Sequence, residues 1–488
     1  MDGRRIDGRG WREWTVAVLL LAVAVAVRAR DFGNPVIHVD EQYYLLVGDR
    51  MLSGAVPYVD LWDRKPIGLF LIFAAIRMLP GDGVLAYQLV ATVCAAATAW
   101  LIARGGRRLG ASMIGSVAAA VAYIVWLSFL SGRGGQSPVF YNLFVAAGGV
   151  LTLGLPARAQ ASDRSAILWS GCIACLLAGM AIQVKYTPVV EGAMFGAAHL
   201  WYLHRAGARW GYLTGAALLW MLLGLAPTLV VIAAYAAAGA ATFDAFWFAN
   251  FMSVTLRRGY PAAKIVARLA GTSAQLSVLA ACVVASLRDR PRSAETVLAA
   301  AWLAAALVAF AMIGAFFDHY ALPLLVPITI LAAPALGRHR WARIAVAAGA
   351  VILAIFHLST ERDERTTART AAAILAKHRD AGCPYVFAGD SVLYLLSRTC
   401  VPTPYAFPST LAYEPERGAV GIDEAAEVAR IIATRPPAIV TMDEPLAPWN
   451  AASHRIVATA IARDYRLAAR LPREGRHLLV YVRRDLRD

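Results

Sequence analysis

The densest group of reactive side chains outside the apolar segments lies in residues 28–66. It contains His38, Asp40, Glu41, Tyr43, Tyr44, Asp49, Arg50, Asp60, Asp63, Arg64 and Lys65. Carboxylates can take up protons, and closely spaced cations can hold an anion. A solvated surface loop is the alternative. An Asp-Glu pair is costly to desolvate close to a membrane, however, and loops of this length are commonly functional.

The composition indicates which elements must position these residues. The 488 residues are 59% hydrophobic and 16% charged, with a mean hydropathy of +0.56, which is typical of a chain that has the bilayer as its solvent. The net charge of +15 could indicate nucleic acid. The arginines lie in short loops between apolar runs, however, so we expect membrane lipids and no nucleic acid as partners.

Apolar runs of about 20 residues recur along the first 358 residues, and each is long enough to cross a hydrocarbon core. We expect eleven spans, at residues 14–27, 84–103, 111–130, 139–155, 166–183, 187–203, 211–235, 264–287, 295–317, 320–336 and 341–358. The first run follows several arginines, and no convincing small-residue cleavage site comes after it, so we expect a retained span.

Loop charges predict the orientation of these spans. The segments on the side of the N-terminus hold seventeen arginines, namely Arg4, Arg5, Arg9, Arg12, Arg104, Arg107, Arg108, Arg158, Arg164, Arg205, Arg209, Arg288, Arg290, Arg292, Arg338, Arg340 and Arg343. The opposite loops hold five cations, namely Arg133, Lys185, Arg257, Arg258 and Lys264. The positive-inside rule therefore predicts a cytoplasmic N-terminus and, with eleven spans, an external C-terminal domain.

The apolar stretch 67–79 is ambiguous, because its thirteen residues are short for a span. We place it on the outer membrane surface, since a further span would invert the charge of every later loop.

Residues 359–488 form a second domain with a mixed pattern. Helical periodicity covers 361–378 and 423–434, strand-like runs cover 385–388 and 438–442, and a helix and two strands follow. The sequence predicts a mainly α, polytopic helical membrane protein with one interfacial helix. It comprises a membrane domain at 1–358, whose first outer loop is 28–83, and a small external α/β domain at 359–488.

Cysteine usage agrees with this topology. Cys383 and Cys400 are the two cysteines of the external domain, where a disulfide can form, although two reduced thiols remain an alternative. Cys172 and Cys175 lie inside an apolar span, which favours packing over metal or redox chemistry.

The string His38-Val-Asp40-Glu41-Gln-Tyr-Tyr44, followed by Pro57-Tyr58-Val-Asp60 and Lys65-Pro66, resembles the first periplasmic loop of the GT-C glycosyltransferases. It is most similar to bacterial relatives of protein mannosyltransferases and of the lipid A aminoarabinose transferase. The resemblance extends to residues 104–110, to Phe317-Asp-His319-Tyr320-Ala-Leu-Pro323 and to residues 385–398.

The resemblance implies a glycosyltransferase of the inner membrane that moves one hexosyl or pentosyl unit from a polyprenyl-phosphate donor. The acceptor, on the outer face, is a lipid, a glycan or a protein. It implies that Asp40 acts as base or metal-organising group, with Glu41 beside it. The topology places cations for the donor phosphate at the same level, namely Lys65, Arg64, Arg133 and Lys185 together with His319 and Tyr320. Tyr43, Tyr44, Asp60 and Asp63 are expected to support the loop or the acceptor.

Two departures from the family pattern bear on these roles. The second outer loop offers only neutral polar groups at Gln136, Ser137, Tyr141 and Asn142, so no second catalytic carboxylate is assigned. No cofactor is therefore assigned, and a divalent cation such as Mg²⁺ or Mn²⁺ is left open, with Asp40 as its one candidate ligand. Lys65-Pro66-Ile67 also lacks the second proline of the family.

Two other classes of function share the hydropathy pattern. A transporter or flippase of lipid-linked substrates should show internal repeats and ionisable groups at mid-membrane, of which Glu191 is the nearest candidate. In a non-catalytic scaffold or sensor, the external domain would carry the function. The sequence leaves open the sugar, the acceptor and the oligomeric state.

Overall fold

A computed structural model gives the fold and describes residues 8–256, 259–289, 293–360 and 363–486. Some residues of the sequence argument lie outside this part, namely Arg4, Arg5, Arg257, Arg258, Arg290, Arg292 and the first two residues of the helix expected at 361–378. The side chains of Arg9 and Arg12 are likewise outside it.

A helix occupies every segment where a span is expected. These helices are α1 (Gly8–Arg28), α4 (Val84–Arg108), α5 (Met113–Leu127), α6 (Ser137–Thr152), α8 (Arg164–Ile182), α9 (Val189–Arg205), α10 (Trp210–Ala237), α12 (Ala262–Asp289), α13 (Ala294–Met312), α14 (Leu325–Arg338) and α15 (Arg340–Thr360). Within the described residues, nine helical stretches are long and apolar enough to cross a bilayer; α1 and the 17-residue α9 are not among them. The polytopic helical prediction is confirmed, and the number eleven stays a prediction.

The shorter helices connect these spans or belong to the C-terminal part of the chain. They are α2 (Val39–Met51), α3 (Ile67–Arg77), α7 (Leu155–Gln160), α11 (Ala240–Trp247), α16 (Arg365–Lys377), α17 (Val392–Leu396), α18 (Ser409–Ala412), α19 (Glu424–Ala433) and α20 (Ala451–Asp464). Short segments of 3-10 or π helix are η1 (Ala29–Asp31), η2 (Ser128–Gly132), η3 (Phe248–Met252), η4 (Ser253–Leu256), η5 (Asp318–Leu324), η6 (Arg379–Ala381) and η7 (Glu414–Glu416). The 11 residues of α3 extend about 16 Å, roughly half a hydrocarbon core, as expected of an interfacial helix.

The chain folds into two compact units, and each is assembled from three segments. The first unit comprises Met1–Arg30, Leu89–Val230 and Pro261–Ser359, and the second comprises Asp31–Gln88, Val231–Tyr260 and Thr360–Asp488. The first loop therefore packs with the C-terminal domain, whereas the division by sequence at residue 358 had grouped it with the membrane helices.

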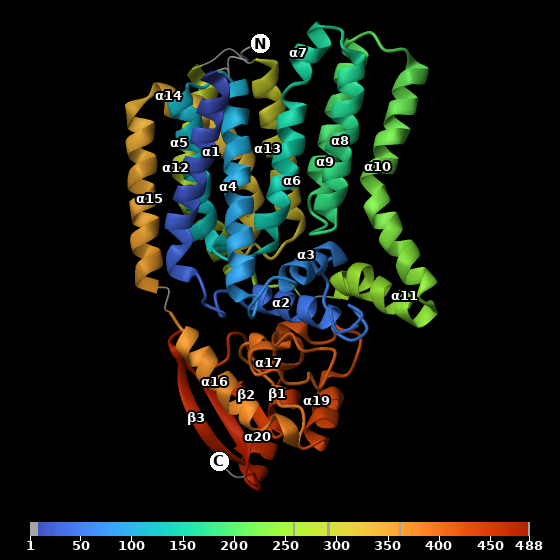
Figure 1. Cartoon of the computed structure of the whole chain (residues 1–488), viewed down its shortest axis with the longest axis vertical. Helices are drawn as coiled ribbons and strands as arrows, with labels where there is room; N and C mark the ends of the chain where they lie inside the picture. The colour runs from blue at the N-terminus through green and yellow to red at the C-terminus, as the bar shows by residue number, and fades with distance from the viewer. Residues whose placement is uncertain (1–7, 257–258, 290–292, 361–362, 487–488) are drawn as a thin grey trace, which may run out of the picture. The chain divides into compact units, whose positions relative to one another are not determined.

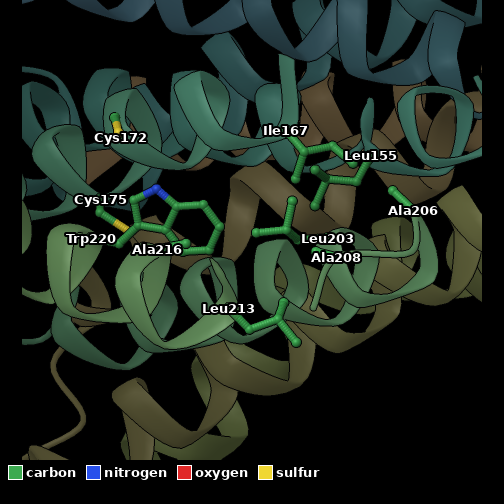
Figure 2. Close-up of a cluster of buried hydrophobic side chains, with 10 residues drawn as sticks. All are labelled: Leu155, Ile167, Cys172, Cys175, Leu203, Ala206, Ala208, Leu213, Ala216 and Trp220. Carbon is green, nitrogen blue, oxygen red and sulfur yellow. The ribbon is translucent and has the colours of Figure 1, made fainter. Parts of the chain in front are cut away.

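The first unit is a bundle of long helices that run roughly along one direction (Figure 1). Helix α14 packs against α5, α12 and α13 and is buried along nearly all of its length. A second contact zone joins α7, α8, α9 and α10 through an apolar cluster that includes Leu155, Leu203 and Trp220 (Figure 2). Cys172 and Cys175 are free cysteines of this cluster, so their role is packing.

The second unit contains a four-stranded sheet made of β1 (Tyr385–Val386), β2 (Ala438–Met442), β3 (Tyr465–Arg473) and β4 (Arg476–Arg483). The strand order is β1-β2-β4-β3; β1 pairs with β2 in parallel, and the other two pairs are antiparallel. The hairpin between β3 and β4 turns at Glu474 and Gly475, both at positive φ, which matches the twist of the strands. The α/β prediction for this domain is confirmed (Figure 1).

A disulfide joins Cys383 to Cys400, whose Cα atoms are 5.1 Å apart. It closes the segment that runs from the start of β1 through α17, so this segment is tied at both ends. The loop carries Asp390, a residue that contacts the first loop.

Candidate active site

Helix α2 presents the Asp-Glu pair at its N-terminus. His38 caps the helix in an extended conformation (φ −150°, ψ 141°), and its side chain accepts a hydrogen bond from the backbone N–H of Asp40. Carboxylates in the first turn interact favourably with the positive end of the helix dipole. The Asp40 side chain is 15% exposed, whereas Glu41 is fully buried. Of the pair, Asp40 is therefore the carboxylate that a substrate can reach.

Asp40, Asp63 and Lys65 each interact with Tyr44, and we call these four residues the loop cluster. The Lys65 Nζ lies 3.8 Å from an Asp63 carboxylate oxygen and 5.3 Å from the centre of the Tyr44 ring. Tyr44 follows Asp40 by one helical turn, and burial, together with the nearby charge of Asp40, raises the pKa of its phenol well above the ordinary value. Tyr44 thus stays neutral between a carboxylate and an ammonium group.

Backbone hydrogen bonds hold Lys65 in place. One Asp63 carboxylate oxygen accepts from the backbone N–H groups of Arg64 and Lys65, at 2.5 Å and 3.1 Å. The Tyr58 hydroxyl donates to the Lys65 carbonyl at 2.8 Å, from a residue in the left-handed region (φ 72°). The Tyr58 ring packs against Tyr235 and Phe246, with 5.6 Å between ring centres in each case. The end of α10 and helix α11 therefore support the loop.

The other predicted loop residues have positioning contacts. The Arg64 guanidinium donates to Glu416 at 2.8 Å, to the Ala419 carbonyl at 3.1 Å and to the Ser253 hydroxyl at 3.2 Å, so it joins all three segments of the second unit. The Asp60 carboxylate accepts from the Val56 N–H at 2.7 Å and closes a turn. The buried Tyr43 hydroxyl donates to the Trp62 carbonyl at 3.0 Å.

The remaining predicted cations belong to the first unit. The Lys185 Nζ lies 4.2 Å above the Tyr320 ring, and the His319 ring meets Tyr320 edge-on at 4.4 Å between centres. These three side chains are half-buried, and η5 carries two of them. Arg133 is 9% exposed and follows η2. Arg268 of α12, not singled out in the sequence, stacks on Phe317 with its guanidinium carbon 3.7 Å from the ring centre.

A buried polar network beside α2 was missed by the sequence reasoning. The Asp390 carboxylate accepts from Gln42 of α2 at 2.9 Å and from two nitrogens of Arg473, both at 2.9 Å. Arg473 also donates to Glu364 at 2.5 Å. Asp390 lies in the run 385–398 that carries the family resemblance, but no local pattern links it to Arg473.

The residues around Asp40 do not by themselves form a metal site. Among the residues that the structure describes, no three His, Cys, Asp or Glu side chains come together closely enough to hold a cation. Mg²⁺ and Mn²⁺ prefer several oxygen ligands. We therefore derive no chemical step through a metal.

The fold is similar to those of membrane glycosyltransferases. ArnT from Cupriavidus metallidurans, solved in the apo state, aligns with a TM-score of 0.62 and 14% identity over 97% of this chain and 98% of that chain. The oligosaccharyltransferase AglB from Archaeoglobus fulgidus, solved with an inhibitory peptide and a dolichol-phosphate, aligns with a TM-score of 0.50 and 11% identity over 89% of this chain and 70% of that chain. No protein-family model and no curated protein sequence matches the chain.

Both solved proteins are GT-C membrane glycosyltransferases, and ArnT is the lipid A aminoarabinose transferase. The likeness covers nearly the whole chain, so the fold expected from the sequence resemblance is confirmed.

Proposed function

We propose that this multi-pass membrane protein is a glycosyltransferase that moves one sugar from a polyprenyl-phosphate donor to a hydroxyl acceptor. The observation that carries the proposal is the loop cluster. In it, the partly exposed Asp40 carboxylate and the Lys65 ammonium group, which Asp63 contacts, both lie near Tyr44, in a chain whose fold is similar to that of ArnT. The dolichol-phosphate in the AglB structure supports a lipid phosphate as the carrier.

Asp40 is the general base of the proposed reaction. As the acceptor oxygen attacks the anomeric carbon of the sugar, its proton passes to the Asp40 carboxylate. The bond between the anomeric carbon and the phosphate oxygen breaks, and its electron pair leaves with the polyprenyl phosphate. This single displacement inverts the anomeric centre.

Fixed cations stabilise the charge that develops on the leaving phosphate. Lys65 is held by Asp63 and by its backbone contacts, so it need not reorganise during the reaction. Lys185, Arg133 and the His319–Tyr320 pair are the proposed phosphate contacts of the first unit. Arg64 acts on the site by holding the loop in place.

The proposed orientation follows from the loop charges. The N-terminus is cytoplasmic, and the C-terminal domain and first loop lie outside the cytoplasmic membrane. A lipid, glycan or protein hydroxyl on that side is the acceptor, and the transferred unit is a hexosyl or pentosyl group. Mg²⁺ or Mn²⁺ would enter only with ligands that the substrates themselves supply.

The test is transfer of labelled sugar from polyprenyl-phosphate donors to membrane extracts, with wild type and Asp40→Asn at equal abundance. Asp40→Asn should lower the rate by about 10²- to 10⁴-fold, the usual contribution of a general base. The matched control is Asp380→Asn, whose side chain is 96% exposed and which should transfer at the wild-type rate.

Equal transfer by wild type and Asp40→Asn would remove Asp40 as base. No transfer by the wild type from any donor would favour a transporter or a scaffold.

A further inference from the structure

A buried carboxylate of the C-terminal domain, that of Asp390, binds the helix that carries Asp40. Gln42, two residues after Asp40, donates to Asp390, which is 348 residues away in the sequence. The Gln42 side-chain oxygen accepts in turn from the Val392 N–H at 3.5 Å. Both Gln42 and Asp390 are 1% exposed, so water does not compete for these hydrogen bonds.

Asp390 is itself held by a charged partner that comes from the end of β3. Two Arg473 nitrogens bind its two oxygens in a fork, the strongest geometry for such a pair. Glu364 and Glu474 bind another nitrogen of the same guanidinium, at 2.5 Å and 2.6 Å. Burial works against the arginine charge, yet these carboxylates outweigh it and raise the pKa of Arg473 above its ordinary value.

The same guanidinium also contacts the chain that leads into α2. Arg473 donates to the Val36 carbonyl at 3.4 Å, two residues before the capping His38. The network therefore holds the chain on both sides of Asp40, at Val36 before α2 and at Gln42 within α2. A segment fixed at both points keeps the carboxylate between them in one position.

We propose that Asp390, clamped by Arg473, is a positioning residue that sets the place of the Asp40 carboxylate through Gln42. This inference rests on the proposed function of Asp40. A shift of about 1 Å in a reacting group can cost about 10²-fold in rate. Loss of the contact should therefore lower kcat and leave the KM for donor unchanged.

The test is a double-mutant cycle with full-length protein in detergent. Gln42→Glu sets two carboxylates against each other, and Asp390→Asn weakens the hold of Arg473; each should lower kcat by about 10- to 100-fold. The double variant restores a carboxylate–amide pair between positions 42 and 390 in reversed order, although Arg473 still faces an amide. It should regain at least tenfold over the worse single variant and remain slower than the wild type. Asp443→Asn, which removes a partner of the exposed Arg470 in the same domain, is the control with unchanged kcat.

Hydrogen exchange of the α2 amides is measured in the wild type, in the two single variants and in the double variant. Faster exchange in each single variant, with recovery in the double, supports the clamp. Additive losses without recovery overturn it, and so does a change in KM alone. If the wild type transfers no sugar, the proposed function fails, while exchange still decides whether Asp390 holds α2.

Discussion

Lys65 combines a fixed backbone with a charged side chain that is 26% exposed. Its carbonyl, its N–H and its ammonium group each have a partner within the first loop. A cation held in this way can stabilise a phosphate without first losing conformational freedom.

Removal of this charge should slow transfer. We expect Lys65→Met to lower kcat/KM for the donor by about 10²- to 10³-fold, and Lys65→Arg to retain part of the rate because the charge remains. Steady-state transfer assays check this, with the exposed Lys377→Met as control. Equal rates for Lys65→Met and Lys377→Met would exclude a role for Lys65 in donor binding or departure.

Tyr44 offers a prediction on pH. Its pKa is raised well above the ordinary value, chiefly by burial, so the phenol stays protonated from pH 6 to 9 and cannot act as the base. Tyr44→Phe should leave the shape of the pH–rate profile unchanged, as measured over that range. If the fall in rate at alkaline pH disappeared in Tyr44→Phe, that part of the pH–rate profile would instead be due to ionisation of Tyr44.

The same shift has a consequence for stability. A buried tyrosine whose folded pKa exceeds its unfolded value contributes stability below about pH 10, and this is lost as pH rises further. The free energy of unfolding of wild type should therefore fall more steeply above pH 10 than that of Tyr44→Phe.

At the scale of elements, the backbones of α2 and α3 approach each other closely at Gly48. A Cβ built on Gly48 of α2 would lie 2.7 Å from the backbone nitrogen of Ala74 in α3. This close approach fixes α3, and with it the Lys65-Pro66 segment that precedes α3, against the helix that carries Asp40.

Gly48→Ala should separate the two helices. We expect it to lower the free energy of unfolding by about 1 to 3 kcal/mol and to slow transfer, because overpacking displaces the backbone. Thermal unfolding and transfer assays check this. The control is Gly215→Ala in α10, where an added Cβ meets no atom within 4 Å. Matching results for the two variants would contradict the role of Gly48.

The helices and strands also show which parts of the fold can be predicted from the sequence. Apolar runs predicted the long helices, and residues 438–442 were predicted as a strand with the bounds of β2. Helix α11 was missed, because eight residues are too few to establish a period. Asp40, Tyr44, Asp63 and Lys65 stand close in sequence and could be grouped, whereas Asp390 and Arg473 could not, because contacts across such separations leave no local pattern.

At the scale of the whole molecule, the orientation of the chain is the main prediction. The disulfide between Cys383 and Cys400 agrees with a domain outside the cytoplasm, where disulfides persist. The arginine-rich loops predict that the opposite ends of the helices lie inside.

Labelling of intact cells tests this orientation. A membrane-impermeant maleimide should modify Lys377→Cys in the C-terminal domain and leave Arg205→Cys unmodified until the membrane is opened. Wild type provides the background from its own cysteines. The reverse pattern would invert the topology and remove the proposed site from the outer face.

The three-segment construction of the second unit has a consequence for how the protein is made. At about 5 to 20 residues per second, synthesis reaches Asp390 roughly 17 to 70 s after Gln42, which is 348 residues earlier. For that interval α2 has left the ribosome but lacks its partner. In the proposed orientation, the proposed site is completed only after the last quarter of the chain has crossed the membrane. We therefore expect a nascent or truncated chain to hold its first loop unassembled and to transfer no sugar.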